Sequence, residues 1–192
     1  ARFLFFFWQE KEKMGGAMHQ PSLVANPPRP KGEYHPPIWG EKEPPMPYKV
    51  YFLSLGCAKN QVNCEQMMSL VQSAGHEILP DPAGADAAVV NTCGFLASAC
   101  EEAIGHILEL AELKRAGALK KILVTGCMAQ RYQAGVLEEL PEIDGILGTG
   151  SYGDIVQALS EAMEAGLRPC RLGNIHTAPQ NGPRILSTPP WY

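Results

Sequence analysis

From residue 48 onward the apolar positions follow two alternating patterns. Short apolar runs predict strands over residues 49–55, 76–79, 87–92, 121–126 and 143–147, with residues 170–172 as a further edge strand. Longer stretches with the spacing of an amphipathic helix lie between them, over residues 61–74, 95–116, 130–140 and 151–165. Because strands alternate with helices, we expect a parallel sheet with helices on both faces.

The connections between parallel strands are right-handed, which makes a doubly wound sheet the default arrangement. Five strands without a long insertion best fit the flavodoxin-like order 2-1-3-4-5. The sequence therefore predicts an α/β fold built on a doubly wound, five-stranded parallel sheet. The folded domain is expected over residues 48–173.

Residues 1–47 have a different composition. The stretch from Pro21 to Pro47 carries nine of the chain's 17 prolines, several of them in pairs. Such pairs exclude regular helix and favour extended, solvated backbone. We predict a disordered or loosely attached Pro-rich leader that forms no domain.

Composition and charge narrow the function classes. The chain of 192 residues is 45% hydrophobic and 19% charged, with a formal net charge of −4, which is ordinary for a globular domain. It lacks the basic face of a nucleic-acid binder. The apolar run Phe3–Trp8 is too short to cross a membrane, so we expect a cytoplasmic protein without a membrane partner. Its six cysteines are then expected to be thiols or metal ligands. The sequence does not indicate an oligomeric state.

Three of the cysteines follow predicted strands. Cys57, Cys93 and Cys127 each lie just after a strand and beside a glycine. In the predicted order these three strands are neighbours, about 4.8 Å apart, so the thiols should meet at the edge where such sheets bind ligands. This constellation predicts a metal or iron–sulfur site. Zinc fits less well, because there is no close C-x-x-C pair and no fourth ligand.

Other polar and sulfur-bearing residues are assigned around this site. Asn60, Asn91 and Thr92 are candidates for hydrogen bonds to cluster sulfur. A single buried cysteine is usually a small hydrophobic residue, and we assign that role to Cys64 and Cys100. Cys170 has no partner in the pattern.

The segments around the three cysteines resemble a known family. They are Ser54-Leu55-Gly56-Cys57-Ala58-Lys59-Asn60, Asn91-Thr92-Cys93-Gly94-Phe95 and Thr125-Gly126-Cys127-Met128-Ala129-Gln130-Arg131-Tyr132. Together with Leu140–Asp144 and Gly148–Gly150, they resemble the N-terminal domain of the radical-SAM methylthiotransferases. The likeness covers residues 48–192 and is closest to the branch that modifies a ribosomal protein, RimO. The form Cys-Ala-Lys-Asn favours that branch over the tRNA-modifying branch, MiaB.

The resemblance implies specific chemistry. Cys57, Cys93 and Cys127 would hold an auxiliary 4Fe–4S cluster with one open iron. A second 4Fe–4S cluster and S-adenosylmethionine would be bound in a following barrel. The substrate would be an aspartate of a small-subunit ribosomal protein, with the ribosome itself as a further candidate partner and tRNA as the alternative substrate.

The sequence departs from the family in one respect that matters. The motif C-x-x-x-C-x-x-C of the barrel is absent. We therefore expect this fragment to contain no catalytic residue, to be inactive alone, and to use residues 174–192 as a linker toward the barrel. A non-catalytic iron–sulfur binding module is the alternative from another functional class.

A glycine-rich segment, Gly148–Gly153, matches G-x-G-x-x-G. A dinucleotide site would need another βα unit and an acidic residue about 20 positions further on, and neither is present. We instead predict that Ser151 caps the following helix, with Asp154 as its capping partner.

Overall fold

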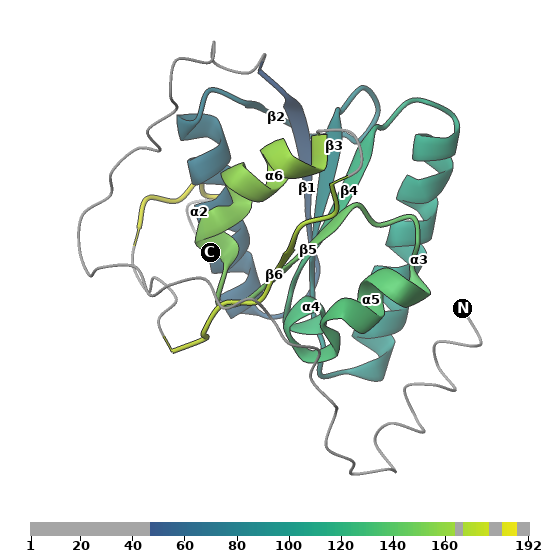
Figure 1. Ribbon diagram of the computed structural model, residues 1–192. Helices are drawn as coiled ribbons and strands as arrows, with labels where there is room; N and C mark the ends of the chain where they lie inside the picture. Colours follow the sequence, from purple (N-terminus) through teal and green to yellow (C-terminus); the bar gives the residue numbers. More distant parts are fainter. Residues whose placement is uncertain (1–46, 164–166, 177–181, 188–192) are drawn as a thin grey trace. The chain divides into compact units, whose positions relative to one another are not determined.

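The computed structural model describes residues 47–163, 167–176 and 182–187. These residues form a six-stranded parallel sheet in the order β2-β1-β3-β4-β5-β6 (Figure 1). The strands are β1 (Lys49–Ser54), β2 (Glu77–Leu79), β3 (Ala87–Thr92), β4 (Lys121–Gly126), β5 (Gly145–Gly148) and β6 (Cys170–Arg171). The α/β class and the order 2-1-3-4-5 are confirmed, and β6 extends the sheet beside β5. All but the last residue of the predicted leader lies outside the described residues.

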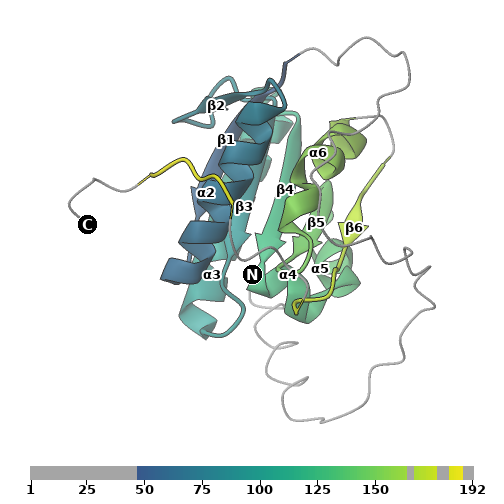
Figure 2. The ribbon, with the colours of Figure 1, turned by 90° about the vertical axis from the view of Figure 1, so that its left-hand side faces the viewer.

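Helices cover both faces of the sheet. Helices α2 (Ala58–Ser73) and α6 (Ile155–Met163) lie on one face, and a short 3-10 helix, η1 (Tyr152–Asp154), leads into α6. Helices α3 (Ala97–Arg115), α4 (Cys127–Tyr132) and α5 (Ala134–Glu139) lie on the other face (Figures 1 and 2). The sheet is therefore doubly wound, as the alternating pattern predicted. Among the described residues, no helix has the length and apolar character needed to span a bilayer.

The core lies between the central strands and the helices. All six residues of β3 are buried, because this strand has neighbours on both sides and helices on both faces. On the α2 and α6 face, side chains such as Val89 and Leu123 pack against Met67 of α2 and Leu159 of α6, all fully buried. The central strands are thus held rigidly, which fixes the positions of their ends.

Among the helix boundaries that differ from the prediction, two lie beside the cysteines. Helix α2 begins three residues early, because Cys57 is its N-cap and accepts the N–H of Gln61 at 3.0 Å. The single helix predicted over residues 130–140 is two helices, α4 and α5, separated by Gln133. Gln133 has a φ of 51°, which interrupts the helical backbone. Helix α4 begins at Cys127 itself, three residues before the predicted start.

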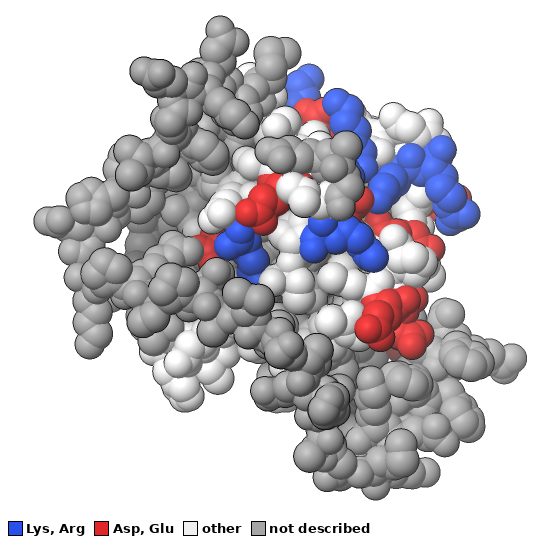
Figure 3. All heavy atoms as spheres, in the orientation of Figure 1, with Lys and Arg blue, Asp and Glu red and all other residues white. Residues whose placement is uncertain are grey.

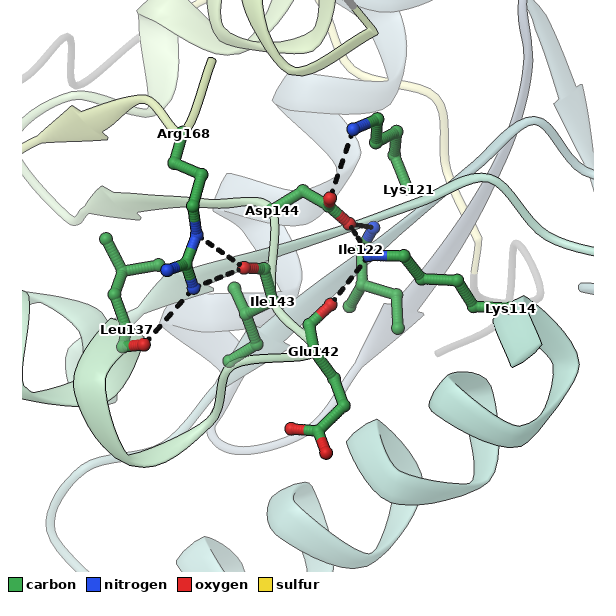
Figure 4. Close-up of polar contacts among 8 residues, drawn as sticks. All are labelled: Lys114, Lys121, Ile122, Leu137, Glu142, Ile143, Asp144 and Arg168. Atoms are coloured by element: carbon green, nitrogen blue, oxygen red, sulfur yellow. Dashed lines mark hydrogen bonds and ion pairs between the residues drawn. The ribbon is translucent and has the colours of Figure 1, made fainter. Parts of the chain in front are cut away.

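The segment Leu140–Asp144 secures the edge of the sheet where β4 begins. The Asp144 carboxylate contacts the amino groups of Lys114 and Lys121 and accepts the N–H of Ile122 at 2.9 Å (Figure 4). Nearby, Arg168 donates to the carbonyl oxygen of Ile143 at 2.7 and 3.1 Å. The residues of this segment that match the family are therefore used for structure, at the edge opposite the three cysteines.

Candidate functional site

The three cysteines follow strand ends that lie level with one another. Ser54 of β1 pairs with Asn91 of β3, and Thr92 of β3 pairs with Gly126 of β4. Cys93 and Cys127 directly follow their strands, and Cys57 lies three residues after β1. We call this part of the sheet, defined by Cys57, Cys93 and Cys127, the cysteine edge. Cys57 is exposed, Cys127 is half-buried and Cys93 is only 9% exposed.

Glycines let the backbone segments of the cysteine edge come close together. A Cβ atom at Gly94 would lie 2.7 Å from the carbonyl carbon of Cys127. Gly126 has a φ of 98°, and a Cβ atom there would lie 2.5 Å from the carbonyl oxygen of Thr92. Side chains larger than hydrogen are therefore excluded at both positions. These close approaches explain why glycines stand beside Cys93 and Cys127 in the sequence.

The side chain of Asn60 links the segments that carry Cys93 and Cys127. Its Nδ2 donates to the carbonyl oxygen of Thr92 at 3.0 Å, and its own carbonyl oxygen accepts from Asn91 Nδ2 at 2.6 Å. The Cys127 thiol lies 3.6 Å from Asn60 Oδ1. Asn60 is 2% exposed, so these contacts are shielded from water. Because both Nδ2 and Oδ1 of this buried amide have partners, Asn60 fixes α2 against the turns after β3 and β4.

The other two predicted supporting residues make different contacts. The side-chain amide of Asn91 donates to the backbone carbonyl oxygen of Asn60. The hydroxyl of Thr92 donates to the carbonyl oxygen of Thr125 at 2.6 Å. Their hydrogen bonds to cluster sulfur remain a prediction. A donor that the sequence did not single out is the backbone N–H of Phe95, which lies 3.5 Å from Cys93 Sγ.

The thiols influence one another electrostatically. Burial raises the pKa of the Cys127 thiol above its ordinary value, and the neighbouring thiols of Cys57 and Cys93 raise it further. Lys59 and Asn60 act in the opposite direction. Three thiolates gathered here would repel one another unless a positively charged metal group accompanied them. Three cysteine sulfurs are donors of the kind that soft metals and iron–sulfur clusters bind, and ligation by these three residues remains a prediction.

The three thiols do not form a recognisable site for a single metal ion in the described residues. Within the part of the chain that the structure describes, no three His, Cys, Asp or Glu side chains are close enough to hold one metal ion. In an iron–sulfur cluster each thiolate binds a different iron, so the ligands stand farther apart. Cluster ligation by Cys57, Cys93 and Cys127 therefore remains a prediction.

Arg131 joins the loop after β3 to α4. Its Nη1 donates to the carbonyl oxygen of Gly94 at 3.0 Å, and its guanidinium carbon lies 5.9 Å from the ring centre of Phe95. Phe95 and Leu96 are 73% and 64% exposed, which places apolar surface beside Cys93. Arg131 lies one helical turn after Cys127, and the sequence did not single it out. Its partner across the loop is visible only in the fold.

The remaining cysteines have other environments. Cys64 and Cys100 are 2% and 8% exposed within α2 and α3, which confirms their assignment to the core. Burial raises the pKa of the Cys64 thiol to about 12, so this group stays protonated. Cys170 lies on the edge strand β6, two strands away from β4.

The glycine-rich segment after β5 is closed rather than open. A Cβ atom at Gly150 would lie 2.2 Å from the carbonyl oxygen of Gly173, and the Ser151 hydroxyl accepts the Gly173 N–H at 2.6 Å. Ser151 makes no side-chain capping bond to the following helix. Ser151 is the N-cap residue of η1 by position, as predicted, but its hydroxyl makes no capping bond because it accepts from a residue distant in sequence. The segment packs against residue 173 in the position where a nucleotide phosphate would need access.

Fold and site together define a doubly wound α/β domain with three thiols at the carboxyl ends of its central strands. Residues 49–148 match the family described as "Uncharacterized protein family UPF0004". The chain belongs to this family, and its resemblance to the N-terminal domain of the RimO-type methylthiotransferases is confirmed.

Curated relatives support this family membership. "Ribosomal protein uS12 methylthiotransferase RimO" of Desulforamulus reducens is 48% identical over 138 residues, which cover 71% of this chain and 31% of that protein. The protein of the same name from Anaeromyxobacter sp. (strain K) is 42% identical over 144 residues, 75% of this chain and 30% of that protein. The protein of the same name from Clostridioides difficile is 44% identical over 142 residues, which cover 73% of this chain and 32% of that protein. The chain spans about a third of the length of these relatives.

Proposed function

We propose that this chain is the auxiliary-cluster domain of a RimO-type methylthiotransferase, in which Cys57, Cys93 and Cys127 hold a 4Fe–4S cluster. The observation that carries the proposal is the level register of β1, β3 and β4, after which these three cysteines follow. The proposal is supported by relatives that carry the name of such an enzyme.

The chain's own residues would perform distinct tasks at such a cluster. Three thiolates would bind three irons, and the cluster would supply a fourth iron open to an exogenous sulfur species. Gly94 and Gly126 keep the backbone close to the site, and Asn60 holds the turn that carries Cys127. The N–H of Phe95 would donate to the sulfur of Cys93 and so stabilise its negative charge.

The whole reaction would need parts beyond this domain. We propose that a following barrel would bind a second 4Fe–4S cluster and S-adenosylmethionine, which would supply the radical chemistry, and that this domain alone is inactive. The proposed substrate is an aspartate of ribosomal protein uS12, the protein named in its relatives. On the face seen in Figure 3, basic and acidic side chains are interspersed, and the net charge is −4, which favours a protein substrate over tRNA. We expect the enzyme to work in the cytoplasm.

Anaerobic reconstitution with iron and sulfide tests the cluster. We expect about four irons per chain, and their loss in a variant with all three cysteines replaced by alanine. Cys57→Ala and Cys170→Ala form a matched pair, because both cysteines are exposed and only Cys57 is a proposed ligand. Equal iron content in the triple variant and the unmodified protein would exclude the assignment.

The substrate requires a separate test. A full-length gene of this type would be expressed in a strain that lacks its own RimO-type enzyme. Mass spectrometry of uS12 should then show a methylthio group in place of one hydrogen, with tRNA unmodified. Modification of tRNA instead would support the alternative substrate.

A further inference from the structure

Helix α2 carries a buried carboxylate that the proposed cluster chemistry does not use. The side chain of Glu65 is only 3% exposed. Its Oε1 accepts the backbone N–H of Ser187 at 3.1 Å and the Ser187 hydroxyl at 2.9 Å. Its Oε2 lies 3.8 Å from Arg184 Nη1. We call residues 182–187, which supply these contacts, the C-terminal strap.

The strap contacts α2 at residues on either side of Glu65 as well as at Glu65 itself. A Cβ atom at Gly182 would lie 3.7 Å from Gln66 Nε2, the N–H of Ile185 donates to the Glu65 carbonyl oxygen at 3.2 Å, and Ser187 accepts from Gln61 Nε2. The last residue of the strap therefore contacts the first turns of the helix that Cys57 caps. Figure 2 shows this segment crossing α2.

The end of the strap is close to the cysteine edge. Gln61 is four residues after Cys57, which corresponds to about 6 Å along the helix axis. Ser187 is thus held about one helical turn from the proposed ligand Cys57. Gln61 also follows Asn60, the residue that contacts the Cys127 thiol.

We propose that Glu65 is a positioning residue that clamps the C-terminal strap to α2 and so holds the end of the strap, Ser187, about one helical turn from Cys57. This inference rests on the proposed function: in a RimO-type enzyme, the domain that follows would be tethered at the edge that carries the cluster. A short, fixed tether raises the effective concentration of the two halves of an active site.

The chemistry of Glu65 supports positioning over simple packing. An apolar side chain would fill the same place without the desolvation penalty of a buried charge. A carboxylate with two hydrogen bonds from Ser187 and an ion pair with Arg184 favours one alignment, because sliding the strap by one residue would break both hydrogen bonds. The strap itself forms neither helix nor strand, so these contacts are what hold it.

Trypsin digestion tests the clamp. The bond between Arg184 and Ile185 is a tryptic site whose N–H is engaged by α2. Loss of hydrogen bonds to a charged group should raise the population of the detached strap, so Glu65→Ala should increase the cleavage rate at Arg184 at least about tenfold. Glu65→Gln retains an acceptor for Ser187 and should give a smaller increase. Glu102→Ala, which removes an exposed acid of α3, is the matched control and should leave the rate unchanged.

A spectroscopic measurement tests the position. Trp191 lies four residues after Ser187, within about 14 Å along the chain. With fluorotryptophan incorporated and Trp8 and Trp39 assigned by Trp→Phe substitution, reduction of the reconstituted cluster to its paramagnetic form should broaden the Trp191 fluorine signal. At equal iron content, Glu65→Ala should reduce that broadening several-fold.

The outcomes separate this inference from the proposed function. Equal cleavage in all variants, or equal broadening with and without Glu65, would overturn the positioning role. If the unmodified protein binds no iron, the proposed function fails, and the trypsin comparison still decides whether Glu65 holds the strap. If Glu65→Ala does not fold, Ser187→Ala removes one of the same bonds from the exposed side and should also increase cleavage.

Discussion

The thiol of Cys127 lies 3.6 Å from Asn60 Oδ1, although 67 residues separate them in the chain. The same amide donates from Nδ2 to the carbonyl oxygen of Thr92, the residue before Cys93. One buried side chain therefore links the turns that carry two proposed ligands, and it does so from the first turn of the helix that the third ligand caps.

Replacing Asn60 should loosen the whole cysteine edge. In Asn60→Ala the buried carbonyl oxygen of Thr92 loses its donor, so we expect the free energy of unfolding to fall by about 1–3 kcal/mol. Iron retention after reconstitution should fall as well, because two ligand turns are no longer fixed. Urea denaturation and iron analysis measure the two effects. Asn63→Ala, on the same helix and half-buried, is the control. An unchanged iron content in Asn60→Ala would contradict a supporting role for this residue.

Gly94 and Gly105 allow a matched comparison of two glycines in neighbouring segments. A Cβ atom at Gly94 would lie 2.7 Å from the Cys127 backbone, whereas one at Gly105, inside α3, would meet nothing within 4 Å. Gly94→Ala should destabilise the fold by about 1–3 kcal/mol and reduce iron binding, because the two cysteine turns must separate. Gly105→Ala should stabilise it by about 0.5–1 kcal/mol. Thermal unfolding of both variants checks the signs, and a stable, iron-binding Gly94→Ala would show that the turns need not touch.

Much of the fold could be predicted because buried parallel strands appear as continuous apolar runs. The structure confirms the predicted bounds of Ala87–Thr92 and Lys121–Gly126, the two central strands. These same strands place two of the three proposed ligands. The cysteine edge followed from the strand order, which depends on this strong local signal.

Other features depend on contacts that no local pattern reveals. Gln133 separates two helices with a positive φ of 51°, although there is no glycine or proline at that position to indicate a break. Ser151 has the sequence context of a helix cap, yet its hydroxyl binds the N–H of Gly173. From the sequence, the strap is predicted to be part of a linker. The buried carboxylate of Glu65, which holds the strap, lies more than a hundred residues earlier, on α2.

The Asp144 carboxylate should matter for stability and not for the cluster. It contacts Lys114 and Lys121 at the edge of the sheet opposite the cysteines. Asp144→Asn removes both ion pairs while it retains an acceptor for the Ile122 N–H, and we expect a loss of about 1–3 kcal/mol. Iron content per folded chain should remain unchanged. Glu139→Gln, an exposed carboxylate of α5, is the control for the loss of one negative charge. A loss of iron without a loss of stability would contradict this division of roles.

His76 should make stability depend on pH. It is 5% exposed, its Nδ1 accepts the N–H of Tyr48 at 3.2 Å, and the two rings stack with centres 5.1 Å apart. Burial lowers the pKa of this imidazole below its ordinary value of 6.5. Above pH 6.5 the ring is neutral in both the folded and the unfolded chain, so its contribution to stability is fully present.

As the pH falls below 6.5, the unfolded chain binds a proton that the folded chain binds only at lower pH. The free energy of unfolding contributed by His76 therefore decreases until the pH passes below the folded-state pKa. Urea denaturation between pH 7.5 and pH 5 should show this decrease, and His76→Gln should reduce its slope. His176→Gln, which replaces an exposed histidine, should retain the slope of the unmodified protein. Equal slopes for His76→Gln and the unmodified protein would show that another group controls the response.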